Sequence, residues 1–371
     1  MKKKFVFSLI LIFLMGIFVE VALQIHYRAT VGRWLSELWA IPIFDTDPVR
    51  KYRMKSDLEF EHNTREFKAT YFTDSQGLRT DERQEDVLPE KSPDTYRILF
   101  LGPSFTFGWG VDYEDTYVSL IGAGLKIPGK TVQIMNLGTP SQPIPNQLCW
   151  LEEKGKEFQP DLIVQTVYGR VTNIRDKCAI PKMSPSVKNG YLMGPDTDSF
   201  KNRLKRVRQK SAILFYGWHL YAQMRSPDEA ENDVGTGTEL YDKETTGALS
   251  GNVDAIVKTF QNYIDLAEQS VGYEVPVVFI YIPFSYMVRP ADIIRVNHKK
   301  HASPEKVLAE VSAVAEKLTV NGCYFINPID ALIERDQKER TYYLVDIHFT
   351  VAGNQTTAEV AIPVVQQAAT Q

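Results

Sequence analysis

The chain of 371 residues is 44% hydrophobic and 24% charged, a composition typical of a globular protein with one large domain or two small ones. Its formal net charge of -4 provides no overall basic field, which argues against nucleic-acid binding, because such binding neutralises many phosphates. Cys149, Cys178 and Cys323 are widely spaced, so neither a thiolate metal site nor a redox pair is indicated. One disulfide is compatible with this spacing, and none is required.

Residues 1–24 predict a membrane anchor. Three lysines at 2–4 precede an apolar run over 5–19, which resumes after Glu20. A span of roughly 19 residues is about the minimum that crosses a bilayer. The residues around Glu20 offer no pair of small residues for signal-peptide cleavage, so we expect an uncleaved anchor. Positive charge ahead of the run predicts a cytoplasmic N-terminus and an extracytoplasmic, periplasmic main domain.

A stalk and one main domain are expected after the anchor. Residues 25–70 mix tryptophan, proline and charges without a sustained period, so we expect a stalk or collar that packs irregularly. Residues 71–80 read as a short strand broken by a turn at Gly77. We therefore expect the main domain to occupy residues 71–371.

Hydrophobic runs in this domain predict an α/β fold with a mainly parallel central sheet. The clearest run, 96–101, shows little polar alternation, as expected for a central strand covered on both faces. Segments with helical spacing, such as 116–125 and 253–268, separate most of the runs, and this alternation favours parallel strands. The other predicted strands are 132–135, 162–167, 275–282 and 324–326.

Residues 177–252 interrupt this rhythm and predict an insertion or lid. A helix is expected over 199–223, and the polar stretch over 226–252 buries so little apolar area that we expect a mobile loop. A basic cluster in the helix suits either a solvated helix face or an anionic polysaccharide or phospholipid surface. The cluster comprises Lys201, Arg203, Lys205, Arg206, Arg208 and Lys210.

Ser104 is the candidate nucleophile. It lies in Gly102-Pro-Ser-Phe-Thr-Phe-Gly108, directly after the strand that ends at Leu101. Ligand sites of parallel sheets lie at the carboxyl ends of the strands, where the amides of a turn leading into a helix can stabilise an oxyanion. The alternative is that Ser104 is a helix N-cap, a common role for serine at such a position.

Asp346 and His348 are the candidate orienting acid and base. They lie two residues apart, ahead of an apolar segment over 357–369 that is expected to be a closing helix. On one loop they can meet and leave the second ring nitrogen of His348 free to take the serine proton. The competing interpretation makes His348 a surface histidine and Asp346 a helix cap.

No metal and no cofactor is expected. His298 and His301 flank two lysines, and this local positive charge opposes a cation. We interpret the segment as a solvated helix end.

These residues resemble the motifs of the SGNH/GDSL hydrolase superfamily, especially its membrane-anchored bacterial members, over roughly 70–371. Gly102-Pro-Ser104 is similar to the first motif, usually Gly-Asp-Ser, without the acidic middle residue. Asp346-Ile-His348 and the following Phe-Thr-x-x-Gly-Asn are similar to the last motif. The resemblance implies a three-layer α/β/α, flavodoxin-like fold with a Ser104, His348 and Asp346 triad.

The resemblance also implies two oxyanion donors. Gly138, in Asn136-Leu-Gly-Thr-Pro-Ser141, occupies the place of the second motif's glycine, whose backbone amide the family uses. The third motif, Gly-x-Asn-Asp, is poorly kept, because Asn173 falls later than in the family. Asn173 is therefore either an oxyanion donor or a simple turn or cap residue.

An activated serine with an oxyanion hole performs acyl transfer to water or to another hydroxyl. The resemblance implies action on O-acetyl groups of cell-envelope or exported polysaccharides, as an esterase or an acetyltransferase with partners in envelope polysaccharide assembly. A lipid esterase or thioesterase is an alternative with the same chemistry. The altered first and third motifs leave another alternative, a catalytically weak module that binds polysaccharide or scaffolds an envelope assembly.

Overall fold

Five parallel strands form the centre of the protein, and all five were predicted from their hydrophobic runs. Their order across the sheet is β12-β11-β8-β6-β7. The strands are β6 (Thr95–Leu101), β7 (Thr131–Asn136), β8 (Leu162–Tyr168), β11 (Val277–Ile282) and β12 (Tyr324–Ile326). Such short runs rich in valine, isoleucine and aromatic residues favour strands covered on both faces, and β11 is buried along its whole length.

The computed structural model describes most of the chain. The described residues are 2–31, 34–35, 41–64, 66–87, 90–169, 178, 180, 185–193, 207, 210–224, 253–290, 304–320, 322–344 and 346–371.

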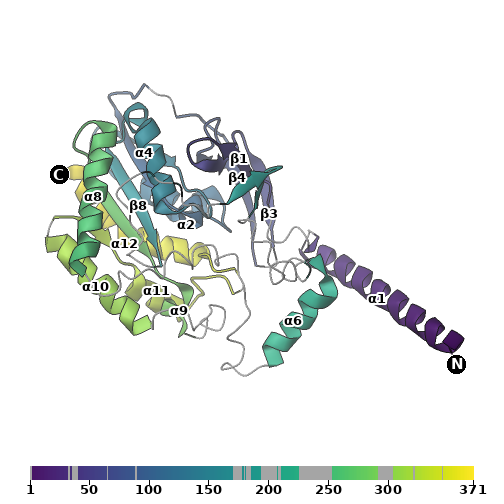
Figure 1. Ribbon diagram of the computed structural model, residues 1–371. Helices are drawn as coiled ribbons and strands as arrows, with labels where there is room; N and C mark the ends of the chain where they lie inside the picture. The colour runs from purple at the N-terminus through teal and green to yellow at the C-terminus, as the bar shows by residue number, and fades with distance from the viewer. Residues whose placement is uncertain are drawn as a thin grey trace.

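Helices cover both faces of the parallel strands (Figure 1). Successive side chains of β6 point to opposite faces, so Leu99 and Leu101 enter one hydrophobic core and Ile98 and Phe100 the other. The first core is closed by α4 (Ile144–Phe158), α8 (Val253–Val271) and α10 (Pro304–Val320). The second is closed by α3 (Tyr117–Gly124), α11 (Ile329–Asp336) and α12 (Val351–Thr370). The expected three-layer α/β/α fold is confirmed.

The carboxyl end of β6 is the natural position for a site. β7 pairs with one side of β6 and β8 with the other, so the chain changes direction across the sheet at this strand. Connections leave such a switch point in opposite directions and open a crevice above it. The residues that follow Leu101 lie at this crevice.

Antiparallel strands extend the sheet beyond β7, in the order β5-β4-β3. They are β5 (Arg79–Thr80), β4 (Lys68–Thr73) and β3 (Glu59–Asn63), and β1 (Phe44–Asp47) and β2 (Lys51–Met54) form a separate hairpin. The expected irregular stalk over 25–70 is therefore wrong for residues 44–70, and the expected boundary at 71 falls inside β4. Alternate residues of β4 are buried in a third core that reaches Phe107, which explains why these short strands join the domain.

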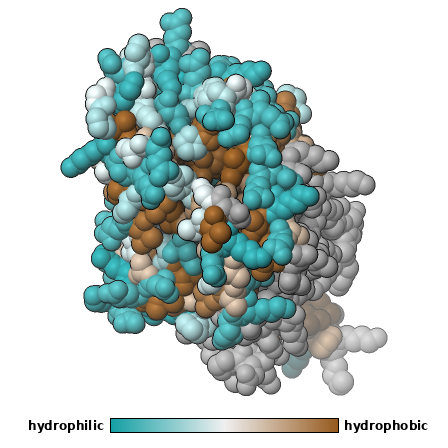
Figure 2. Space-filling view, turned by 90° about the vertical axis from the view of Figure 1, so that its left-hand side faces the viewer, coloured by the Kyte–Doolittle hydropathy of each residue, from teal (hydrophilic) through white to brown (hydrophobic). Residues whose placement is uncertain are grey.

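One apolar helix leaves the α/β layers (Figure 1). This helix, α1 (Lys2–Val31), contains the segment Lys4–Thr30, which is long and apolar enough to cross a membrane. None of its most apolar window is buried inside the protein. The face of the molecule turned away from α1 is a mixture of hydrophilic residues and apolar patches (Figure 2).

The expected insertion is described in part. The hairpin of β9 (Ser186–Lys188) and β10 (Tyr191–Met193) bonds to β1 through the amide of Phe44, and α6 (Ala212–Met224) packs on α1. A disulfide joins Cys149 of α4 to Cys178, which settles the question that the spacing left open. The polar stretch 226–252, the segment 298–301 and all of the basic cluster except Lys210 lie outside the described residues.

Candidate active site

Ser104, His348 and Asp346 meet at the carboxyl end of β6. Nε2 of His348 lies 2.6 Å from Oγ of Ser104, and Nδ1 lies 2.5 Å from Oδ1 of Asp346. Both partners of the pair are partly buried, with 14% of the His348 side chain and 19% of the Asp346 side chain exposed. The structure thus joins the three predicted residues in one chain of hydrogen bonds, the arrangement of nucleophile, base and orienting acid in serine hydrolases.

Ser104 is the first residue of a short helix, α2 (Ser104–Phe107). The N-cap of α2 is Pro103, and the Ser104 hydroxyl bonds to His348, so the alternative of an N-cap role for Ser104 is wrong. The preceding turn is tight because Gly102 has no side chain: a Cβ there would lie 1.8 Å from Oγ1 of Thr106. The candidate nucleophile therefore lies at a sharp strand-to-helix turn.

Three buried hydroxyls fasten α2 to the sheet. The hydroxyls of Thr106, Tyr117 and Thr166 lie 2.7 to 2.9 Å from one another, and they come from α2, α3 and β8. Burial raises the pKa of Tyr117 to about 12, so its hydroxyl keeps its proton at neutral pH. A satisfied polar network in a core resists deformation, and here it fixes the position of the helix that carries Ser104.

The loop that carries Asp346 and His348 is closed like a narrow hairpin. Tyr342 and Phe349 form an antiparallel bridge, and the amide of Tyr343 donates to the carbonyl of His348 over 3.0 Å. The His348 ring packs against Phe105, with ring centroids 4.8 Å apart. The loop geometry and this ring contact together hold the imidazole in line with Ser104.

Both carboxylate oxygens of Asp346 are used. Oδ1 also accepts from the amide of His348 over 3.1 Å, and Oδ2 accepts from Nε1 of Trp109 over 3.1 Å. Burial alone would raise the pKa of Asp346, but the charge of His348 and the hydrogen bonds from His348 and Trp109 outweigh it. The net pKa lies below the usual value, so Asp346 is ionised at neutral pH and can stabilise a protonated His348.

Sequence reasoning missed Trp109 and Glu66. The carboxylate of Glu66, in the turn between β3 and β4, accepts from the backbone amide of Asp346 over 2.7 Å. Trp109 lay within reach of sequence analysis, because it follows the nucleophile motif directly. No local pattern pointed to Glu66, since its partner lies 280 residues away.

Residues of the antiparallel strands pack against Trp109 and the turn that follows it. The His62 ring packs edge-on against Trp109, with centroids 4.8 Å apart, and its Nδ1 lies 2.9 Å from the hydroxyl of Tyr71. That hydroxyl also accepts from the amide of Gly110 over 2.9 Å. β3 and β4 therefore support the turn that carries Trp109, the hydrogen-bond donor to Asp346.

The amide of Gly138, the first expected oxyanion donor, has a partner within its own loop. Its amide donates to Oδ1 of Asn136 over 2.9 Å, while Nδ2 of Asn136 donates to the carbonyl of Thr106 over 2.8 Å. The amide is thus occupied and does not serve as a free oxyanion donor in this structure. A Cβ at Gly138 would lie 2.2 Å from the backbone nitrogen of Phe107, so the glycine permits the loop after β7 to press against α2. Asn173, the second expected donor, lies outside the described residues.

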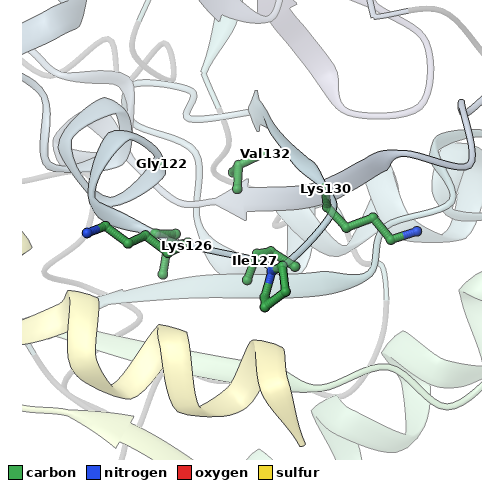
Figure 3. Close-up of a pocket in the computed structure, with 7 residues that line it drawn as sticks. Gly122, Lys126, Ile127, Lys130 and Val132 are labelled. Carbon is green, nitrogen blue, oxygen red and sulfur yellow. The ribbon is translucent and has the colours of Figure 1, made fainter.

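Two shallow cavities lie away from the triad. One, of about 370 Å³, is lined by residues that include Lys126, Ile127 and Lys130, between α3 and the start of β7 (Figure 3). The other includes Asp161, just before β8. Both lie toward the amino ends of the parallel strands, opposite Ser104. Within the described residues, no group of three or more histidine, cysteine, aspartate or glutamate side chains could hold a metal ion.

The solved structures that are similar to this protein share little sequence identity with it. A member of the lipolytic protein G-D-S-L family from Veillonella parvula is 14% identical, covers 73% of this chain and 97% of its own, and has a TM-score of 0.37. A carbohydrate acetylesterase family member from Sinorhizobium meliloti is 10% identical, with 74% and 100% covered and a TM-score of 0.40. A lipase/acylhydrolase from Enterococcus faecalis is 14% identical, with 73% and 96% covered and a TM-score of 0.37. No protein-family model and no curated protein sequence matches the chain.

Proposed function

We propose that the protein is a serine-dependent acyl-ester hydrolase or acyltransferase of the SGNH/GDSL type. The observation that carries this proposal is the unbroken chain of hydrogen bonds from Asp346 through His348 to Ser104. The assembly disfavours the module without catalysis, because ordering three polar side chains in this geometry serves nucleophilic attack. The missing acidic residue of the first motif does not break the triad, since Ser104, His348 and Asp346 are linked with Pro103 in its place.

The reaction proceeds through an acyl-enzyme. Nε2 of His348 takes the proton of Ser104 as Oγ attacks the carbonyl carbon of the ester, and the carbonyl oxygen becomes an oxyanion. His348 then returns the proton to the departing alkoxide. Water, or the hydroxyl of an acceptor, attacks the acyl group in a second round in which His348 is again the base. Asp346 stabilises the imidazolium in both rounds.

The oxyanion needs donors close to Oγ of Ser104. The amide of Ser104 is well suited, because amides in the first turn of a helix have no partner within the helix. To act as the second donor, the amide of Gly138 would first have to release Oδ1 of Asn136. Asn173 stays a candidate, and Ser141 is another, because its left-handed backbone (φ 61°) is unusual for a residue other than glycine and such strain concentrates at functional sites.

A membrane-anchored, extracytoplasmic enzyme acting on O-acetyl groups of a cell-envelope or exported polysaccharide fits these features best. The apolar helix α1 supplies the anchor, and the lysines at 2–4 favour a cytoplasmic N-terminus. The Cys149–Cys178 disulfide supports an oxidising compartment such as the periplasm. Partners of such an enzyme would be other proteins of envelope polysaccharide assembly.

Acetyl-ester turnover by the full chain in detergent, compared between the wild type and Ser104→Ala, tests the proposal. We expect acetate release from p-nitrophenyl acetate and from acetylated oligosaccharides, and a loss of at least a thousandfold in Ser104→Ala. A fluorophosphonate label should mark the wild type alone. Equal rates in the two proteins, or no label, would favour the polysaccharide-binding module. A preference for long acyl chains or thioesters would favour the lipid esterase or thioesterase.

A further inference from the structure

The helix α6 is rich in apolar residues, yet several of its described side chains are not buried in a protein core. Its 13 residues, Ala212–Met224, include no aspartate, glutamate, lysine or arginine. Ile213, Leu214 and Leu220 are 38%, 45% and 59% exposed. Large apolar side chains exposed on one helix mark a surface that contacts lipid or another molecule. These three side chains are therefore not part of a protein core.

A carboxylate on α1 fixes the start of α6. Glu20 accepts hydrogen bonds from the hydroxyl of Ser211 over 2.8 Å and from the amides of Ala212 and Ile213 over 2.7 and 3.0 Å. Gln24, one turn further along α1, donates to Glu20 and to the carbonyl of Lys210. Ionisable residues in an apolar span are costly unless they are paired, and here the free amides of α6 satisfy the carboxylate.

Side-chain packing continues the contact between the two helices. Ala212 is fully buried in a small core with Tyr27 and Leu35, and Phe215 packs edge-on against Tyr27 with centroids 5.6 Å apart. The residues that face α1 thus alternate, with helical spacing, with the exposed Ile213, Leu214 and Leu220. One face of α6 is covered by α1, and the opposite face is apolar and open to the surroundings.

The location of α6 identifies what covers its open face. Figure 1 shows α6 beside the end of α1 that is nearer the domain, outside the α/β layers. Most of the exposed large apolar side chains of the described residues lie in α1, and α6 adds three more. Because the start of α6 is bonded to Glu20, inside the candidate span of α1, the lipid around a spanning α1 would also reach the exposed side chains of α6.

We propose that α6 is a second membrane-contacting helix, embedded beside α1 among the lipid acyl chains of the leaflet that faces the catalytic domain. The proposal rests on the proposed anchoring by α1. Thirteen residues make a helix of roughly 20 Å, short of the roughly 30 Å hydrocarbon core, so α6 enters the bilayer without crossing it. Two joined membrane elements, in place of one flexible tether, hold the triad close to the membrane surface.

Spin-label accessibility in the full chain tests this proposal. Single cysteines replace Leu11 in α1, Leu214 and Leu220 in α6, and the 82% exposed Val320 as an aqueous control, in a Cys323→Ser background with the native disulfide oxidised. The proteins are reconstituted in vesicles of phosphatidylethanolamine and phosphatidylglycerol. Labels at Leu214 and Leu220 should collide with oxygen, which dissolves in lipid, several times more than with a water-soluble nickel complex, and Val320 should show the reverse.

The possible outcomes test the role of α6 and the role of the anchor separately. A lipid signal at Leu11 with aqueous signals at Leu214 and Leu220 would overturn the role of α6 and leave the anchor intact. An aqueous signal at Leu11 would overturn the anchor itself, and with it the basis for α6. Labels at Leu214 and Leu220 that are shielded from both reagents would indicate burial against protein, which also contradicts the proposal.

The hydrogen bonds between Glu20 and the start of α6 are tested by Glu20→Ala, with Glu20→Gln as the matched variant that keeps one acceptor oxygen. Loss of the cap in Glu20→Ala should raise the collision rate of the Leu220 label with the nickel complex at least twofold. The collision rate in Glu20→Gln should lie between those of Glu20→Ala and of the protein with Glu20 intact. Unchanged accessibility in Glu20→Ala would show that Glu20 does not hold α6 in place.

Discussion

Nε1 of Trp109 donates a hydrogen bond to Oδ2 of Asp346 over 3.1 Å, and this bond joins the turn after Ser104 to the loop that carries Asp346 and His348. The two segments are 237 residues apart in the chain. His348 already interacts with Oδ1, so the indole provides the hydrogen bond to the second carboxylate oxygen. The bond thus ties the orientation of Asp346 to the position of Ser104.

Trp109→Phe keeps the ring and removes only the donor. A hydrogen bond to a charged group contributes about 1.5–3 kcal/mol, so we expect kcat to fall by about tenfold or more with little change in KM. The same bond helps to lower the pKa of Asp346, so its loss raises that pKa. The acidic limb of the pH–activity profile of Trp109→Phe should therefore shift to higher pH. Trp150→Phe, a change at a buried residue of α4, is the matched control and should leave the pH profile unchanged. Identical pH profiles for all three proteins would refute the positioning role.

Gly138→Ala should displace α2. The new Cβ would meet the backbone of Phe107 at 2.2 Å, and backbone cannot rotate away as a flexible side chain can. We expect a loss of about 2 kcal/mol or more in the free energy of unfolding, as for overpacked cores, together with a fall in kcat. Gly129→Ala is a control, because Gly129 has a positive φ but no atom within 4 Å of the added Cβ. It should cost about 1 kcal/mol and leave kcat unchanged. Wild-type kcat in Gly138→Ala would contradict the proposed packing role.

Asp74 should make stability depend on pH. Burial raises the pKa of this carboxyl to about 6, and Oδ2 of Asp74 has no hydrogen-bond partner among the described residues. Below about pH 4 both the folded and the unfolded chain hold this proton, and between about pH 4 and 6 only the folded chain does. The stabilisation is therefore complete at low pH and is lost as pH rises through about 6.

Denaturant unfolding of the full chain in detergent at pH 4 to 8 measures this effect. Relative to the wild type, Asp74→Asn should gain about 2 kcal/mol as pH rises across this range, because it cannot ionise. The same change at the exposed Asp94 should give no such pH-dependent difference. Parallel stability curves for the wild type and Asp74→Asn would show that burial does not perturb this carboxyl.

The Cys149–Cys178 disulfide predicts a thiol count. The oxidised chain should titrate one thiol after denaturation, Cys323, and three after reduction. Closing a loop over a separation of 29 residues is worth about 3.5 kcal/mol in the chain-entropy model, so Cys178→Ser should lower the free energy of unfolding by up to that amount. Three thiols in the chain before reduction would contradict the disulfide.

The elements of the α/β layers were predictable from the sequence. Runs such as Leu162–Tyr168 predict a strand covered on both faces, because a strand that is buried on both faces consists mainly of apolar residues. Ser104 was identified because it follows such a run, and Asp346 and His348 because two residues suffice to bring acid and base onto one loop. These signals are local, and a single sequence carries them in full.

Contacts between distant segments were decided only by the tertiary structure. β3 and β4 are short strands with half-buried alternation, too weak a pattern to tell a sheet edge from a stalk. The hydrogen bonds of Glu66 and Trp109 with Asp346, and the close approach of Gly138 to α2, depend on how separate loops meet at one edge of the sheet. Such meetings follow from the packing of the whole core and leave no periodicity along the chain. The sequence alone therefore determined which residues could react, and the fold determined which residues hold them in place.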